Sequence, residues 1–149
     1  MKIEKDYEEF IELLNKLKVK YCIVGSFALA IHARPRYTKD MDIIVEPEQE
    51  NSASLMKALK QFGFDSPDIT EEDFLEKDQI IQLGYEPVRI DLLTSVAGCS
   101  FAEIWNNKVT VRYGKAEAFF MGKEQLIKTK KATNRNQDQA DLELLGDES

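Results

Sequence analysis

The chain has 149 residues, 43% of them apolar, and its 27 Asp and Glu against 20 Lys and Arg give a net charge of −7. This length and apolar content predict one domain over residues 1–149, built on one hydrophobic core, and they exclude a multidomain protein. The negative charge disfavours both a broad nucleic-acid-binding surface and a surface for anionic membranes.

Two further features of the sequence predict a cytoplasmic protein. No apolar run approaches the roughly 20 residues that a membrane span needs, and residues 1–6 lack the apolar segment of a signal peptide. Without an export signal, Cys22 and Cys99 are expected to stay reduced rather than to form a disulfide.

The N-terminal half of the chain alternates helical and strand patterns. Asp6 and Glu9 resemble a capping box, and the apolar residues that follow recur at the spacing of an amphipathic helix. The first strand is continuously apolar, as expected for a strand that helices cover on both faces. The predicted order is a helix from Asp6 to Leu17, a strand from Lys20 to Val24, the turn Gly25-Ser26, a short helix at 27–31, a polar loop at 33–39, a strand from Met41 to Val45, and a helix from Pro47 to Gly63.

The C-terminal half begins with an acidic stretch, residues 65–78, which we interpret as a surface excursion with a short helix after Thr70. Two pairs of strand-like runs then flank glycine-containing turns; the first pair predicts a hairpin and the second a further pair of strands. The expected elements are strands at 79–83 and 88–93, one or two helical turns at 100–106, strands at 109–113 and 117–120, and closing helices at 123–133 and 137–145. This order predicts an α/β (α+β) domain in which helices flank a mixed sheet, with a helical C-terminal end.

Asp40 and Asp42 lie two residues apart where an apolar strand begins, so both carboxylates can project to one face of that strand. Carboxylates held this close repel each other unless a cation or a proton lies between them. Mg²⁺ commonly takes one or two protein carboxylates and completes its octahedron with water and phosphate oxygens. On its own, an Asp-x-Asp pattern is more typical of a solvated turn before a strand.

Asp91 lies in the middle of the apolar run at 88–93, where a buried carboxylate needs a partner or a metal. If this strand neighbours the strand of Asp42, three carboxylates converge. The alternative is an ion pair between Arg89 and Asp91 on one strand face. Both interpretations hold if Arg89 orients a metal-binding Asp91.

Gly25-Ser26 is a candidate phosphate-binding turn. A glycine before a helix lets a substrate approach the backbone, and the free amides of the helix N-terminus favour an anion. Ser26 either caps its helix, which is the more usual role, or donates its hydroxyl to a phosphate oxygen.

In their order, these motifs resemble those of the nucleotidyltransferase superfamily that includes DNA polymerase β. The segment VGSFALAIHARPRYTKDMDIIVE is similar to the small prokaryotic branch related to AbiEii-type nucleotidyltransferases, and EQLIKTKKATNRNQDQADLELL resembles the closing helices of that branch. The matching positions are Gly25, Ser26, Ala28, Leu29, His32, Arg36, Thr38, Asp40 and Asp42 in the first segment, and Leu126, Ile127, Lys130, Arg135, Asp138 and Asp141 in the second.

The resemblance implies a polymerase β palm-like fold and a Mg²⁺-dependent (or Mn²⁺-dependent) nucleotidyltransferase. It implies that Asp40, Asp42 and Asp91 are catalytic and bind two metal ions, of which one activates an acceptor hydroxyl and the other neutralises the triphosphate and the departing pyrophosphate. The nucleoside triphosphate, for example ATP, would contact Gly25, Ser26, Arg36, Thr38, Lys130 and Arg135. For the cations among these residues, plain salt bridges are an equal alternative.

His32 and Trp105 each have both a structural and a functional interpretation. His32, the only histidine, fits a packing or capping role better than that of a proton acceptor. Trp105 shares helical spacing with Phe101 and Ile104, which favours core packing over a base-stacking platform.

No second domain is evident that would bind an acceptor, so the acceptor is expected to be a small molecule, a protein side chain or an RNA end that docks at the rim. A homodimer or a partner protein also fits. Two other functions stay open: a non-catalytic module of the same fold, such as a toxin–antitoxin component, and metal-dependent phosphohydrolysis, in which the same ions activate water.

The charge is unevenly distributed along the chain. Residues 46–80 contain three lysines against ten acidic residues, which accounts for the whole net charge of −7, whereas residues 123–135 contain five basic residues and one acidic residue. The acidity therefore still allows a compact site for a metal-bound triphosphate.

Overall fold

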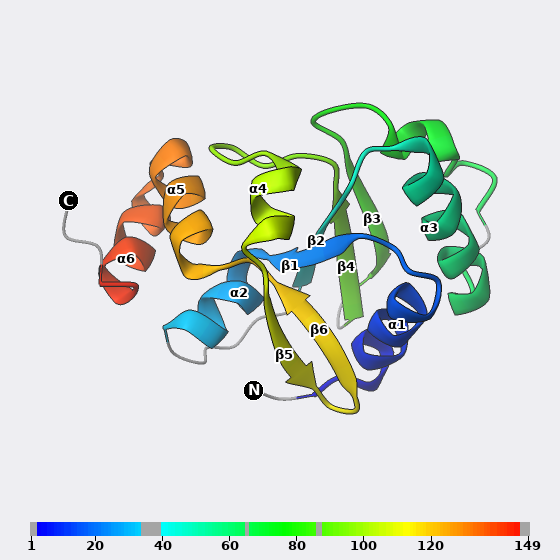
Figure 1. The fold of residues 1–149 in the computed structure, drawn as a ribbon, viewed down its shortest axis with the longest axis horizontal. Coiled ribbons are helices and arrows are strands. Elements are labelled where there is room, and N and C mark those ends of the chain that lie inside the picture. The colour runs from blue at the N-terminus through cyan, green and yellow to red at the C-terminus, as the bar shows by residue number, and fades with distance from the viewer. Residues whose placement is uncertain (1–2, 34–39, 65, 86–87, 147–149) are drawn as a thin grey trace.

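The computed structural model has a six-stranded mixed sheet with the strand order β3-β4-β2-β1-β6-β5 (Figure 1). The structure describes residues 3–33, 40–64, 66–85 and 88–146. β1 runs antiparallel to β2 and parallel to β6, and β2 runs parallel to β4. The strands are β1 (Tyr21–Val24), β2 (Asp40–Val45), β3 (Ile80–Tyr85), β4 (Val88–Leu93), β5 (Val109–Tyr113) and β6 (Ala116–Phe120). The predicted mixed sheet is confirmed.

The predicted hairpin is present, and the second predicted pair of strands also forms a hairpin. β3 pairs with β4 and β5 pairs with β6, each in antiparallel register. The first hairpin extends further than expected, because Gly84 and Tyr85 pair with Arg89 and Val88 as part of the ladder rather than belonging to the turn.

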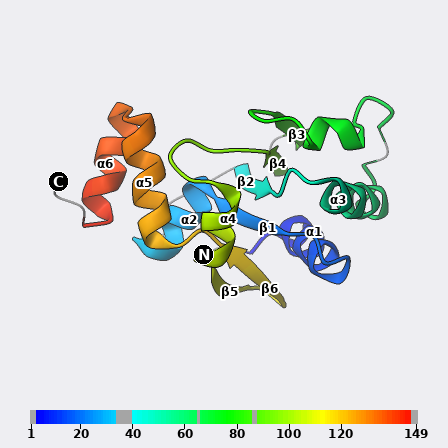
Figure 2. The same cartoon turned by 45° about the horizontal axis from the view of Figure 1, so that its top comes forward.

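Helices alternate with the strands in the predicted order. They are α1 (Lys5–Lys16), α2 (Gly25–His32), α3 (Gln49–Phe62), the 3₁₀ helix η1 (Glu71–Phe74), α4 (Phe101–Asn106), α5 (Lys123–Thr133) and α6 (Asn136–Leu144). α2 packs on β1 and β2, and α1 packs on β4 and β6. α5 and α6 form a pair at one end of the molecule, which confirms the predicted helical C-terminal end (Figures 1 and 2).

The core lies around β1, whose four residues are all buried. Tyr7 of α1 and Phe27 of α2 meet edge to face with ring centroids 5.7 Å apart, and Phe10 packs on Phe62 of α3 at 5.1 Å. These contacts hold α1 against α2 and α3. Both cysteines are free, Cys22 within the core.

Four local predictions were wrong. α1 begins at Lys5, and its cap residue Glu4 makes no side-chain cap hydrogen bond, so the capping box predicted from Asp6 does not form. The backbone N–H of Glu4 instead donates to the Tyr113 hydroxyl at 2.9 Å, a partner more than a hundred residues away. α3 begins at Gln49, two residues after Pro47.

The remaining two corrections concern residues that were expected at the surface or in a turn. The acidic excursion carries the predicted short helix, but Phe74 of that helix is fully buried and joins the core. α2 begins at Gly25 rather than after Ser26, and Val24 occupies the cap position without a side-chain cap bond. Ser26 therefore lies in the first turn and is not the cap.

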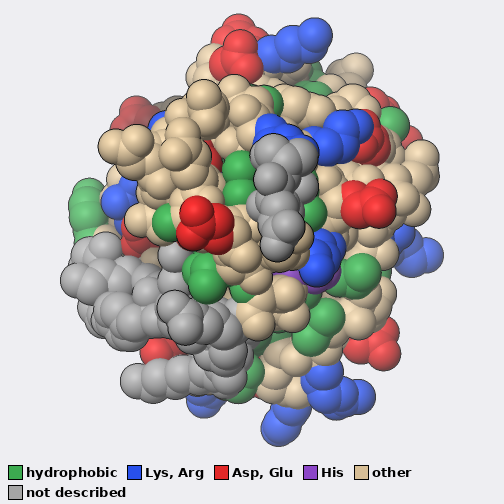
Figure 3. All heavy atoms as spheres, turned by 90° about the vertical axis from the view of Figure 1, so that its left-hand side faces the viewer, with side chains coloured by type: hydrophobic (Ala, Val, Ile, Leu, Met, Phe, Trp, Pro, Cys, Tyr) green, Lys and Arg blue, Asp and Glu red, His purple; other side chains and the backbone are tan. Residues whose placement is uncertain are grey.

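The end of the molecule formed by α2, α5 and α6 carries charges of both signs. Figure 3 shows acidic and basic side chains interspersed over the described part of this face. Within the described ranges, no helix is long and apolar enough to cross a membrane.

Candidate active site

The register of the central strands gathers the three predicted carboxylates. Asp42 of β2 has Asp91 of β4 as its direct partner, and Asp40 lies opposite Arg89. Paired residues of neighbouring strands project to the same face of a sheet. Asp40, Asp42, Asp91 and Arg89 thus share one face, next to the end of β1, where Val24 pairs with Asp42.

Arg89 is the cation of this group, which we call the strand cluster. Its Nε and Nη2 donate to the two carboxylate oxygens of Asp91, each at 3.0 Å, and its Nη1 lies 3.8 Å from Oδ2 of Asp40. Such a two-bond contact fixes both planar groups. The alternative interpretation of Asp91, an ion pair with Arg89, is thus present.

Negative charge exceeds positive charge in the strand cluster. The pKa of Asp42 is raised from 3.8 to about 6, mainly by burial and then by the charges of Asp91 and Asp40, against the opposing effect of Arg89. Oδ1 of Asp40 is buried and has no hydrogen-bond partner among the residues that the structure describes. A buried, unsatisfied carboxylate oxygen beside a carboxyl whose pKa is raised is an environment that a cation would relieve.

Gly25 supplies space for the carboxylate of Asp42 at the start of α2. Its φ is +66°, a conformation that costs L-residues energy, and a Cβ there would lie 2.5 Å from Oδ2 of Asp42. The glycine is required twice, for the tight passage from β1 into α2 and for the close approach of the carboxylate. The Gly25-Ser26 motif and the Asp-x-Asp motif thus belong to one site.

The donor set fits a divalent cation in part. Asp40 and Asp42 offer carboxylate oxygens of the kind that Mg²⁺ takes, one of them unsatisfied. Asp91 is engaged by Arg89, and no group of three His, Cys, Asp or Glu side chains in the described ranges is arranged to hold a metal ion. In this arrangement Asp91 has Arg89 as its counter-ion.

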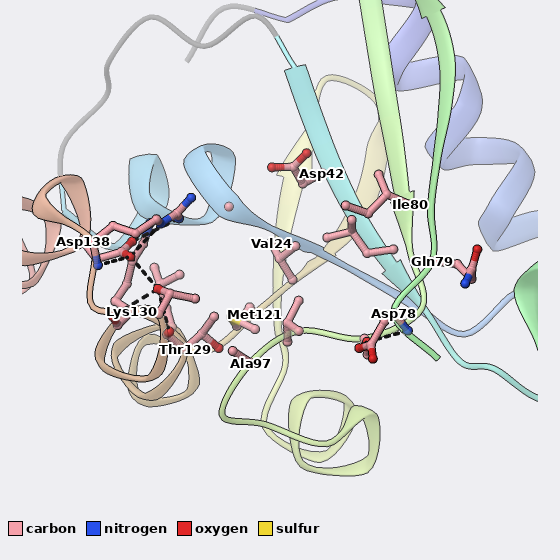
Figure 4. Close-up of a pocket in the computed structure, with 17 residues that line it drawn as sticks. Val24, Asp42, Asp78, Gln79, Ile80, Ala97, Met121, Thr129, Lys130 and Asp138 are labelled. Carbon is pink, nitrogen blue, oxygen red and sulfur yellow. Dashed lines mark hydrogen bonds and ion pairs between the residues drawn. The ribbon is translucent and has the colours of Figure 1, made fainter. Parts of the chain in front are cut away.

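A pocket of about 600 Å³ opens between α5 and the part of the sheet around Val24 and Asp42. Gly25, Asp42, Lys130 and Arg135 are the predicted site residues that line it. Figure 4 shows Asp42 and Val24 in its middle part, with Lys130 and Asp138 on one side and Asp78 and Gln79 on the other. Asp40, Asp91 and Ser26 lie outside its lining.

Lys130 and Arg135 belong to a second ionic group, which we call the helix cluster. Nζ of Lys130 lies 2.9 Å from Oδ2 of Asp141 and 3.4 Å from Oδ1 of Asp138, and all three side chains are at most 10% exposed. Nε of Arg135 donates to Asp138 at 2.9 Å. The hydrogen bonds from Arg135 are the main reason why the pKa of Asp138 lies well below its usual range. The salt-bridge alternative for these two cations is thus realised, on the wall of the pocket.

The other predicted residues have mixed outcomes. Arg36 and Thr38 lie outside the described residues. Nε2 of His32 lies 2.7 Å from the carbonyl oxygen of Met121 and ties the end of α2 to the end of β6, as a structural role requires. Trp105 packs on Phe119 at a centroid distance of 5.5 Å, and its packing role is confirmed.

Sequence reasoning missed much of the pocket wall. Leu126, Thr129 and Thr133 line it together with the predicted Lys130, at positions i, i+3, i+7 and i+4 of α5, a spacing that could have identified them as one helix face. The segment with Asp78 was assigned to the surface, because nothing local indicates that it faces the strand ends.

Comparisons with solved structures identify the class of fold. TM1012 from Thermotoga maritima, a candidate nucleotidyltransferase, superposes with a TM-score of 0.61 over 99% of this chain and 97% of its own, at 16% sequence identity. The lincosamide antibiotic adenylyltransferase LnuA, solved with lincomycin bound, superposes with a TM-score of 0.59 over 98% of each chain, at 14% identity. No protein-family model and no curated protein matches the sequence.

This chain therefore has the nucleotidyltransferase fold, as the resemblance implied. At such low identity the likeness concerns the fold, and any activity has to be argued from the residues of the site.

Proposed function

We propose that this protein is a Mg²⁺-dependent nucleotidyltransferase that moves a nucleoside monophosphate from a nucleoside triphosphate to a hydroxyl acceptor. The observation that carries the proposal is the contact of Asp42 with Gly25 on the wall of the pocket, beside Asp40 and Asp91, in a nucleotidyltransferase fold.

The residues of the strand cluster suit this chemistry. Asp40 and Asp42 would hold the metal ions, which when bound neutralise the triphosphate and lower the pKa of the acceptor hydroxyl. Gly25 lets the carboxylate of Asp42 lie close to the first turn of α2, and the N-terminus of that helix attracts phosphate oxygens. Lys130 and Arg135 lie on the opposite wall, where they are paired with Asp138 and Asp141.

The transfer is a substitution at the α-phosphorus. The acceptor oxygen bonds to that phosphorus, the bond from phosphorus to the bridging oxygen of the β-phosphate breaks, and pyrophosphate leaves with the electron pair. The hydroxyl proton passes to solvent.

A small-molecule acceptor is favoured over a macromolecule. LnuA, a lincosamide antibiotic adenylyltransferase whose structure holds lincomycin, matches this chain over nearly the whole length of both. A chain of this length can thus carry an acceptor site for a small molecule without a further domain.

The test is to incubate the protein with each labelled nucleoside triphosphate, Mg²⁺ and a cell extract. Wild type is expected to transfer label to one acceptor, and Asp42→Asn to lose the transfer because it loses the metal. Asp68→Asn, an exposed carboxylate outside the pocket, is the matched control. Equal labelling by wild type and Asp42→Asn would contradict the assignment.

A second candidate function is a non-catalytic module of the same fold, such as a toxin–antitoxin component. The two hydrogen bonds from Arg89 to Asp91 favour it, since they satisfy a carboxylate that catalysis would use. Calorimetry with Mg²⁺ and each triphosphate distinguishes the two functions: binding that Asp42→Asn abolishes favours the transferase, and the absence of binding by wild type supports the module.

A further inference from the structure

The side of the pocket remote from Lys130 combines a carboxylate with exposed apolar side chains. Two segments meet there: the residues that lead into β3, including its first residue, and the residues that follow β4. We call this region the acceptor rim; its residues are Asp78, Gln79, Ile80, Ser95, Val96 and Ala97. Figure 4 shows Asp78 and Gln79 across the pocket from Lys130.

Asp78 is held in place at the rim. The Ser95 hydroxyl donates to Oδ1 of Asp78 at 2.7 Å, and the backbone N–H of Asp78 donates to the Ser95 oxygen at 3.0 Å. Asp78 has a φ of +60°, which Asp tolerates better than most residues. Next to it, the backbone N–H of Gln79 donates to the Thr94 hydroxyl at 2.9 Å. These bonds orient the carboxylate before any ligand arrives.

The rim combines negative charge with apolar surface. No described residue forms an ion pair with Asp78, and Asp78 is exposed. Ile80 is 68% exposed, an unusual state for a large apolar side chain, and Val96 and Ala97 continue the apolar surface. The cations of the pocket, Lys130 and Arg135, line the other side.

We propose that the acceptor rim binds the acceptor, and that the acceptor is a small amphipathic molecule with a protonated amine as well as a hydroxyl. The amine lies against Asp78, and the apolar body covers Ile80 and Val96. A phosphate-rich acceptor such as an RNA end would meet the Asp78 carboxylate and is disfavoured. This inference rests on the proposed function, because it assigns the second substrate of that reaction.

The test uses three probes with the same six-carbon tail and different charge: hexylammonium, hexanol and hexanoate. Each is titrated at pH 7 into the full-length wild type, and amide chemical shifts of residues 78–80 and 95–97 are followed. We expect hexylammonium to bind at the rim about threefold or more tightly than hexanol, and hexanoate to bind most weakly.

Two variants separate the charge of the rim from its apolar surface. Asp78→Asn is expected to remove the preference for hexylammonium over hexanol, and the matched control Asp68→Asn to retain it. Ile80→Thr, which keeps a strand-forming residue, is expected to weaken the binding of hexylammonium and of hexanol equally. Tighter binding of hexanoate than of hexylammonium, or an unchanged preference in Asp78→Asn, would overturn the inference.

Binding of Mg²⁺–ATP to the same samples separates this inference from the proposed function. If Mg²⁺–ATP binds and hexanoate is the preferred probe, the inference alone fails. If hexylammonium binds at the rim and Mg²⁺–ATP does not bind, the proposed function fails and the rim is an amine site without a role in transfer.

Discussion

The two ionic clusters of this protein have opposite electrostatic states. The helix cluster pairs two cations with two buried aspartates, and its Asp138 has a pKa well below the usual range because Arg135 donates to it. The strand cluster sets three carboxylates against one arginine, and the pKa of its Asp42 rises to about 6.

This difference separates a cluster that stabilises the fold from one that is suited to a ligand. Charges that satisfy each other hold elements together, and here they join α5 to α6. A surplus of buried like charge costs stability, so it is retained where a ligand of opposite charge relieves it. By this criterion we propose that the strand cluster is the binding site, and breaking each cluster in turn tests the contrast.

The largest expected effect comes from breaking the helix cluster. Asp138→Ala removes a fully buried carboxylate and leaves the buried Lys130 with one partner, so we expect a loss of about 3 kcal/mol in the free energy of unfolding. Urea denaturation measures it. Glu143→Ala, an exposed position on the same helix, is the control and should change little. Similar small losses in both variants would show that the helix cluster is not a stabilising unit.

Removing a charge from the strand cluster is expected to raise the free energy of unfolding rather than to lower it. The pKa of Asp42 is raised in the folded state, so the stability that its proton brings is lost as the pH rises from about 4 through about 6. At pH 7.5, Asp42→Asn should therefore be more stable than wild type by about 2 kcal/mol. The gain should vanish near pH 4, and denaturation curves at both pH values check it. A destabilised variant at pH 7.5 would contradict the surplus of negative charge.

A smaller loss is expected at Gly25. Gly25→Ala should cost about 1.5 kcal/mol through its positive φ, and more because its Cβ displaces the carboxylate of Asp42. Gly63→Ala is the matched control, since Gly63 also has a positive φ but nothing lies within 4 Å of its Cβ position. The difference between the two melting temperatures isolates the crowding at Asp42; equal losses would mean that Asp42 moves away freely.

The smallest expected effect is electrostatic and concerns Arg89. Arg89 is the main group that lowers the pKa of Asp42, so Arg89→Gln should raise that pKa above 6, by up to about one unit. Carboxyl ¹³C chemical shifts followed against pH measure the change. A lower pKa in the variant would reverse the sign assigned to this guanidinium.

Much of the strand cluster is predictable because its parts follow from short patterns. The apolar strand fixes the shared face of Asp40 and Asp42, and Gly25 marks the end of the preceding strand. The choice between the two roles of Asp91 needed the register, because only the pairing of β2 with β4 places Arg89 between Asp91 and Asp40.

The parts that could not be predicted depend on contacts between distant segments. The start of α1 depends on the hydroxyl of Tyr113, and the state of Lys130 depends on how α6 folds back on α5. The acceptor rim likewise forms only when Asp78 meets Ser95 across the β3–β4 hairpin. Local periodicity carries no information about such partners.

The central claim is that the strand cluster is a cation site, and the ionisation of Asp42 tests it most directly. Its carboxyl ¹³C shift is titrated with and without saturating Mg²⁺ and a non-hydrolysable ATP analogue. We expect a pKa of about 6 in the absence of these ligands and a value lower by at least about one unit in their presence, because a bound cation favours the charged carboxylate. The same pKa in both conditions would contradict the claim.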